Sequence, residues 1–215
     1  MVSHRKICNT IDGTVNFTEV WAAGYIHALA NSVANGDIKH VDYLKLRLEN
    51  YEDRYSLDDI QKAVQALPAA KRLWITWCNL PKNMGVQHWK KAADVGAKMD
   101  TMFLEGIYDG NRPTECTGFE YELGRLATRA TRVFLYEVRC YDFELFSKGV
   151  LQGIGEEGAC CERISWEDSI IYGEDFKVFV EQLGWEIEGG CGGIYDYPRV
   201  MDVVIKKSDN KDANN

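Results

Sequence analysis

The sequence predicts an α/β domain built on a doubly wound, mainly parallel sheet of five strands with helices on both faces. Two observations predict this class. Short apolar runs alternate along the chain with segments of helical periodicity, which is the order of successive βαβ units. Hydrophobic residues make up 46% of the 215 residues, enough for a sizeable core and too many for a disordered chain.

The apolar runs and periodic segments give the expected order of elements. Strands are expected at residues 5–11, 73–78, 101–104, 132–136 and 164–166, with an edge strand at 200–205. Helices are expected at residues 17–34, 56–67, 84–99, 117–129 and 176–183. The charged segment 38–55 has no clear period and is interpreted as at most a short helix. We detect no internal repeat. Residues 1–207 are therefore expected to form one domain, followed by a disordered polar tail at 208–215.

Composition excludes several kinds of partner. Lys and Arg number 25 against 33 Asp and Glu, which gives a net charge of -8, so neither nucleic acid nor an anionic membrane is expected as the main partner. No apolar run approaches the ~20 residues of a membrane span, and no signal peptide is recognisable. The 7 cysteines and 4 histidines are scattered without ligand spacing, so no metal or cofactor is expected. Reduced thiols favour a cytoplasmic location.

Parallel topology gives the expected position of a site. Ligands of such sheets bind beyond the carboxyl ends of the strands, so the loops at 9–14, 79–83 and 105–118 are the candidates. Residues 153–158 match the letters G-x-G-x-x-G of a dinucleotide site. Their two glutamates would repel a pyrophosphate, and the segment is interpreted as a flexible loop.

The stretch 115–125 carries the chemistry. Thr117 followed by Glu120 forms a capping box, so a helix is expected to begin here. Glu122 then lies near the positive helix end, which favours an ionised carboxylate. From spacing alone, the simpler interpretation of Glu122 is an exposed ion pair with Arg125.

Residues 118–125, Gly-Phe-Glu-Tyr-Glu-Leu-Gly-Arg, resemble the nucleophile motif of the nucleoside 2-deoxyribosyltransferase superfamily. They are closest to its 2′-deoxynucleoside 5′-phosphate N-hydrolase branch. Residues 99–105 resemble an Ala-Asp pair and strand of that family, and residues 7–13 resemble its first strand and loop. The resemblance implies a Rossmann- or flavodoxin-like form of the predicted sheet, with segment 36–70 expanded.

By this resemblance Glu122 is the nucleophile that attacks C1′ of a (deoxy)ribosyl donor, and water or a second base resolves the glycosyl-enzyme. Asp94 is the nearest counterpart of an assisting family carboxylate, and Asp109 or Glu115 lies where the family holds the base. The implied substrate-binding residues are Thr10, Asp12, Gly13, Asp109, Cys116, Thr117 and Gly118. Family members complete their pockets from a neighbouring subunit, so a homo-oligomer is expected.

Two departures keep alternatives open. Lys6 stands where the family has a Tyr, and Asp12 stands where the hydrolase branch has a phosphate-binding Arg, so a 5′-phosphate would be repelled. Base release or base exchange on a nucleoside or nucleotide is the first interpretation. Cleavage of NAD or an ADP-ribose derivative is the second. A non-catalytic nucleotide-binding or inhibitory protein on the same fold is the third.

Overall fold

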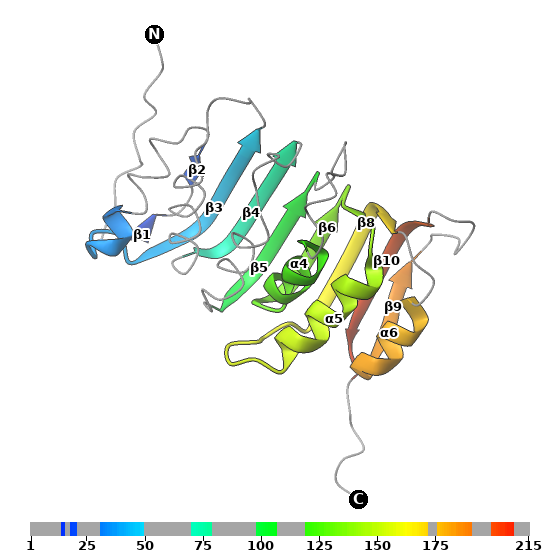
Figure 1. Ribbon diagram of the computed structural model, residues 1–215. Helices are drawn as coiled ribbons and strands as arrows, with labels where there is room; N and C mark the ends of the chain where they lie inside the picture. The colour runs from blue at the N-terminus through cyan, green and yellow to red at the C-terminus, as the bar shows by residue number, and fades with distance from the viewer. Residues whose placement is uncertain are drawn as a thin grey trace, which may run out of the picture.

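The computed structural model describes residues 14–15, 18–20, 31–49, 70–78, 98–106, 119–171, 176–190 and 199–208. Within these residues all strands belong to one sheet, and three helices have complete bounds (Figure 1). The strands are β1 (Thr14–Val15), β2 (Thr18–Val20), β3 (His40–Glu49), β4 (Ala70–Cys78), β5 (Met99–Glu105), β6 (Ala130–Tyr136), β7 (Arg139–Cys140), β8 (Arg163–Ile171), β9 (Trp185–Gly190) and β10 (Arg199–Lys207). The helices are α4 (Phe119–Ala127), α5 (Phe143–Ile154) and α6 (Phe176–Leu183).

The long parallel strands follow one another across the sheet in chain order. β1 and β2 both pair with β3, and β4, β5, β6 and β8 continue from it, each parallel to the strand before. The short β7 also pairs with β8 in parallel, and β10 and β9 complete the sheet as antiparallel strands. A mainly parallel α/β sheet is therefore confirmed.

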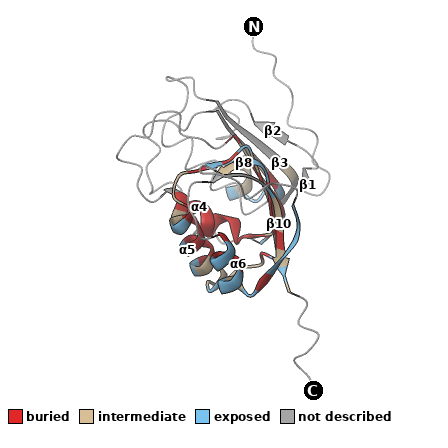
Figure 2. Cartoon of the chain, turned by 90° about the vertical axis from the view of Figure 1, so that its right-hand side faces the viewer, coloured by how far each residue is buried: buried red, intermediate tan, exposed pale blue. Residues whose placement is uncertain are grey.

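The doubly wound arrangement is not what the described strands form. A doubly wound sheet reverses its strand order at a switch point, with later strands added on the other side of the first. Here the parallel strands run in one direction, and the described part of the chain holds seven long strands and three short ones rather than five. Helices α4, α5 and α6 all lie on one side of the sheet (Figure 2). The predicted strand number and order are wrong because each right-handed crossover steps the same way.

The strands stack as a structural repeat. One row of register partners crosses five parallel strands, and its members recur at a nearly constant step along the chain: Leu44, Leu73, Met102, Val133 and Ile164. A second row lies two positions further along each strand: Leu46, Ile75, Leu104, Leu135 and Trp166. The expectation of no internal repeat is wrong, because this step defines a recurring unit whose length falls in the range of stacked repeat proteins.

A backbone turn recurs with the same step. Gly106, Glu137 and Asp168 adopt φ values of 66°, 51° and 47°, and each occupies the same place in its own unit. The N–H groups of Gly106 and Glu137 donate to the carbonyl oxygens of Tyr136 and Glu167, both at 3.0 Å. A left-handed conformation costs a non-glycine residue roughly 1–2 kcal/mol. Its recurrence therefore shows that the repeat constrains the backbone as well as the side chains.

The hydrophobic core lies between the sheet and the three helices. Strand residues that face the helices are almost fully buried: Leu73, Met102, Leu104, Val133, Leu135, Ile164 and Trp166. Aromatic rings fill the space below β8, where Trp166 packs edge-on against Phe146 and Phe176, with centroids 6.3 and 5.5 Å away. Phe143 contacts Phe179 in the same edge-on manner at 5.3 Å. This face of the sheet therefore forms the hydrophobic core with the helices.

Helices α4 and α5 meet through glycines. A Cβ on Gly149 would overlap the carbonyl oxygen of Tyr121, and one on Gly124 would overlap the carbonyl oxygen of Phe146. At Gly153 the added atom would meet the Thr128 hydroxyl. The two helix backbones are in contact with no side chain between them, which sets the spacing of these two repeats.

Most elements expected in the described residues are confirmed, and several are additional. The expected strands of β4, β5, β6, β8 and β10 form, as do the expected helices of α4 and α6. Strand β3 occupies the segment interpreted as at most a short helix, and β2 lies where the helix 17–34 was expected to begin, although residues 31–34 are helical. Helix α5 and strand β9 were not predicted. The strand at 5–11, the helix at 56–67 and residues 84–97 of the next helix lie outside the described residues.

We predict that Gly149→Ala destabilises the fold by about 1–3 kcal/mol, because the new methyl group pushes α4 and α5 apart. An ordinary Gly→Ala change inside a helix would instead stabilise it by up to ~1 kcal/mol. Urea denaturation followed by circular dichroism measures the difference. Gly189→Ala is the matched control, because nothing lies within 4 Å of its added Cβ. Equal midpoints for both variants would contradict the close helix contact.

Candidate functional site

The structure describes one of the residues predicted to form a site. Glu122 lies in the first turn of α4. The remaining predicted site residues lie outside the described residues: Thr10, Asp12, Gly13, Asp94, Asp109, Cys116, Thr117 and Gly118. Their grouping around Glu122 therefore stays a prediction.

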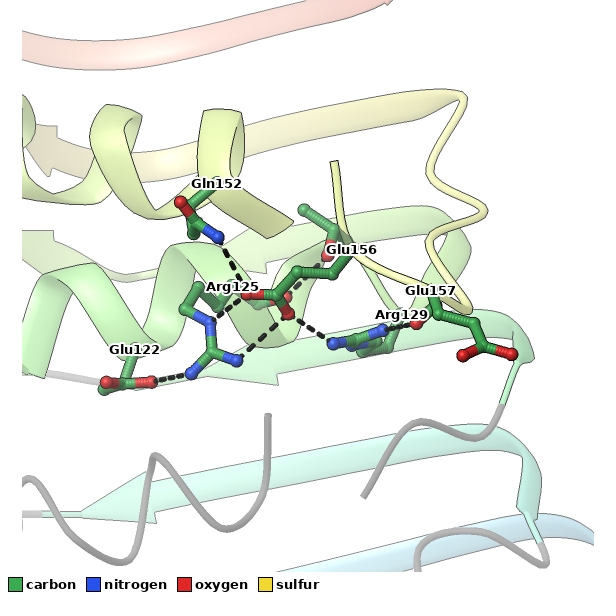
Figure 3. Close-up of polar contacts among 7 residues, drawn as sticks. Glu122, Arg125, Arg129, Gln152, Glu156 and Glu157 are labelled. Atoms are coloured by element: carbon green, nitrogen blue, oxygen red, sulfur yellow. Dashed lines mark hydrogen bonds and ion pairs between the residues drawn. The ribbon is translucent and has the colours of Figure 1, made fainter. Parts of the chain in front are cut away.

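The Glu122 carboxylate is buried and paired. The residue is only 5% exposed, and Arg125 Nη1 donates to its Oε2 at 2.7 Å (Figure 3). The predicted pair of Glu122 with Arg125 is thus confirmed, but it is buried rather than exposed. Removing Arg125 would leave the buried Glu122 carboxylate without this ion pair, so the contact contributes to stability.

The pair belongs to a larger network that joins α4 to the turn after α5. Arg125 Nε and Nη2 donate to the two carboxylate oxygens of Glu156 at 2.9 and 3.0 Å. Arg129 Nη2 donates to Glu156 Oε2 at 2.6 Å, and its Nη1 donates to the backbone carbonyl of Glu157. Two carboxylates and two guanidinium groups therefore alternate, and their charges balance.

This network also explains the segment whose letters match a dinucleotide motif. Glu156 is the fourth residue of that G-x-G-x-x-G stretch, and its carboxylate points at Arg125 and Arg129 rather than at an open loop (Figure 3). The hydrogen bond from Arg125 lowers the pKa of the Glu156 carboxyl below its usual value, against the opposing effect of burial. The segment forms a helix end and a turn whose carboxylate holds two helices together.

The face of the sheet opposite the three helices carries a second group of side chains. We call this surface the open face, and its members on the parallel strands include Tyr43, Arg72, Trp74, Thr101, Phe103, Glu105, Arg132, Phe134, Tyr136, Arg163, Ser165 and Glu167. They occupy the strand positions that alternate with the core residues. Helices α4, α5 and α6 do not lie on this side (Figure 2).

Aromatic rings form a row through the middle of the open face. Phe103 and Phe134 are stacked, with centroids 4.7 Å apart and planes inclined by 12°. Trp74 lies 5.6 Å from Phe103 on the other side, and Tyr43 adds an edge contact to Trp74 at 6.4 Å. Trp74, Phe103 and Phe134 are half-buried, so this row presents apolar surface. The indole Nε1–H of Trp74 donates to Glu105 Oε2 at 2.6 Å.

Charged rows flank the aromatic row on both sides. Two positions towards the strand starts, the register partners are Arg72, Thr101, Arg132 and Arg163. Two positions towards the strand ends, they are Thr76, Glu105, Tyr136 and Glu167, and Arg47 of β3 is the register partner of Thr76. Arginine therefore recurs in the first row and glutamate in the second, with neutral residues between them.

Sequence reasoning missed the open face, although a signal was present. Three strands carry an aromatic residue between two apolar ones, in Leu73–Ile75, Met102–Leu104 and Val133–Leu135. If these triplets belong to strands buried on both faces, every side chain lies in a core. If they are successive copies of one repeat, each repeat places one aromatic residue on the same face of the sheet.

Comparison with protein-family models, with curated proteins and with solved structures gives no match. The chain's own geometry therefore carries the functional inference. Among the described residues, no group of histidine, cysteine or carboxylate side chains is arranged to hold a metal ion. No helix in that part of the chain is long and apolar enough to span a membrane.

The adjacent cysteines Cys160 and Cys161 are free thiols. Burial raises the pKa of the Cys161 thiol to about 12, so this group is not a thiolate near neutral pH. Because the thiolate is the reactive form, Cys161 acts as a small core residue.

We predict that the ion network makes stability depend on acid pH. The pKa of Glu156 is lowered in the folded protein, so its contribution is complete above the unfolded value near 4.5 and is lost as pH falls through the folded value. The urea midpoint of the wild type should fall between pH 5 and 3 more steeply than that of Glu156→Gln. Glu181→Gln is the control, since that carboxylate is exposed and lies 3.7 Å from Lys177 in an i,i+4 contact on α6. Parallel pH profiles for the wild type and Glu156→Gln would contradict this role.

Proposed function

We propose that this chain is a binding protein whose ligand is a segment of another protein that lies across the open face. The single observation that carries the proposal is the contiguous row of Trp74, Phe103 and Phe134 on the side of the sheet opposite the helices. Aromatic side chains in a contiguous surface row are the residues that most often anchor protein partners.

The repeat architecture supports the same function. Apolar residues occur at the first, fourth and sixth positions of the strand units, as in Ala130, Val133 and Leu135, with Val138 at the ninth. All four are buried. This spacing is similar to the consensus of leucine-rich repeats, in which one strand per repeat lines an extended surface. Stacked repeats of this kind present side chains from many strands at once and suit elongated ligands.

We predict that Phe103→Ala with Phe134→Ala strongly weakens peptide binding. Random 12-residue peptides displayed on phage would be selected on the full chain, and the selected peptides would be synthesised and titrated by fluorescence anisotropy. Truncating two central aromatic anchors should weaken binding at least about thirtyfold, because each typically contributes 1 kcal/mol or more. Val178→Ser, an exposed position on α6, is the control and should bind like the wild type. Unchanged binding by the double variant would exclude the open face as the site.

A second candidate keeps the N-glycosidic reaction on a nucleoside, a nucleotide or an NAD-like donor. The observation that favours it is the position of Glu122 in the first turn of the helix that follows β5. A carboxylate there can stabilise an oxocarbenium-like transition state. The contact with Arg125 accounts for the same residue without catalysis, so the binding function ranks first.

The two functions differ in their dependence on Glu122. The N-glycosidic proposal expects the wild type to release free base from nucleosides, 5′-monophosphates or NAD, and Glu122→Gln to lose that release, because an amide is not a nucleophile. Chromatography of the free base is the measurement. Glu156→Gln is the control, because it disturbs the same ion network one step further from Glu122. No release from any of these donors would leave the binding function alone.

A further inference from the structure

The charge on the open face is divided along the strand direction. From β4 to β8, arginines lie at the strand starts (Arg72, Arg132 and Arg163) and carboxylates lie at the strand ends (Glu105 and Glu167), with the aromatic row between them. Strand β3 departs from this division, because Arg47 is its residue at the strand-end level. Between β4 and β8 the open face therefore has a positive flank and a negative flank separated by apolar surface.

The arginines of the positive flank are held in place by neutral groups. The Arg72 guanidinium lies over the Tyr43 ring, 5.5 Å from its centroid, and Arg132 Nη2 donates to Thr101 Oγ1 at 3.2 Å. Within the described part of the chain, neither Arg72 nor Arg132 forms an ion pair. Their charge is positioned but uncompensated there, unlike that of Arg163, which pairs with Glu188 at 2.9 Å.

At the negative flank, Glu105 accepts a hydrogen bond from the Trp74 indole and Glu167 is exposed. Two further carboxylates, Glu137 and Asp168, are exposed in the turns next to this flank. Within the described ranges, Glu137, Glu167 and Asp168 form no ion pair. The charge of Glu137, with smaller contributions from burial, Asp168 and Glu167, raises the pKa of the Tyr136 phenol. The carboxylates at this flank therefore act on the Tyr136 side chain of the open face.

We propose that the partner of the open face is a protein segment with an apolar centre, acidic side chains along its flank at the strand starts, and basic side chains along its flank at the strand ends. This inference rests on the proposed binding function and adds the chemistry and orientation of the ligand. Charge complementarity selects this partner, because the two flanks would repel a segment docked the opposite way round. The five strands from β3 to β8 span roughly 20 Å, which a 12-residue segment can cross.

The same geometry disfavours a single-stranded nucleic acid. Phe103 and Phe134 stack on each other across adjacent strands, so their planes stand upright on the sheet and present ring edges to the ligand. Bases stack on exposed ring faces. The phosphates would also meet the carboxylates of the negative flank.

The test uses the peptides selected on the wild-type chain. They should be enriched in acidic residues on one side of an apolar centre and basic residues on the other. Reversing the positive flank with Arg72→Glu and Arg132→Glu should weaken their binding at least about tenfold, since two charge pairs become repulsive. Peptides with Lys in place of their acidic residues should then bind the double variant better than the wild type. Lys148→Glu with Lys177→Glu changes the net charge equally on the helix side and should leave binding unchanged.

The remaining outcomes distinguish the proposed binding function from the inference about the charge of the partner. Peptides that depend on Phe103 but not on the flank charges would overturn the charge inference and leave the binding function in place. An absence of selected peptides would overturn both. Tight binding of a 20-nucleotide poly-dT would replace the protein partner with a nucleic acid. Concentration-dependent dimerisation in sedimentation, abolished by Phe103→Ala, would replace it with a second copy of this chain.

Discussion

The constraint on which the structure depends is the in-register stacking of apolar strand residues at a nearly constant step along the chain. Leu73, Met102 and Val133 can pair with one another only if each connection leads back to the same level of the next strand. Successive right-handed crossovers in one direction then place their helices on a single side of the sheet. The core under the helices and the surface opposite them both follow from this pairing.

The spacing between neighbouring helices must match the spacing that the strands of the sheet impose. Parallel strands lie about 4.8 Å apart, whereas packed helices with ordinary side chains lie 8–10 Å apart. Glycines at the contact of α4 and α5 bring those helices closer than side chains would allow. The arginines and Glu156 then join the layer by charge rather than by apolar packing. Within residues 118–125, which resemble a nucleophile motif, Arg125 connects α4 to the turn after α5.

The predictability of each part from sequence has a physical cause. β4, β5 and β6 were predicted because their apolar runs are continuous. β3 was not predicted, because its leucines alternate with charged residues and form no continuous apolar run. The repeat is not evident in the sequence because equivalent strand positions hold different apolar residues, such as Leu73, Met102 and Val133. Spacing on one helix predicted the pair of Glu122 with Arg125. It could not predict Glu156, which lies in the next repeat and becomes a neighbour of Arg125 only through the stacking of the units.

The antiparallel end of the sheet bears on how such a chain can change its length. β10 runs back along β8, and β9 follows it in the opposite sense, so the surface after β8 no longer offers a parallel strand to the next unit. A new unit therefore cannot be appended there without dismantling the terminus. Duplication within the array, for example of the stretch from β6 to the start of β8, would preserve every neighbour on both sides. At this end of the sheet, evolution or design would therefore lengthen the array by duplicating an internal unit.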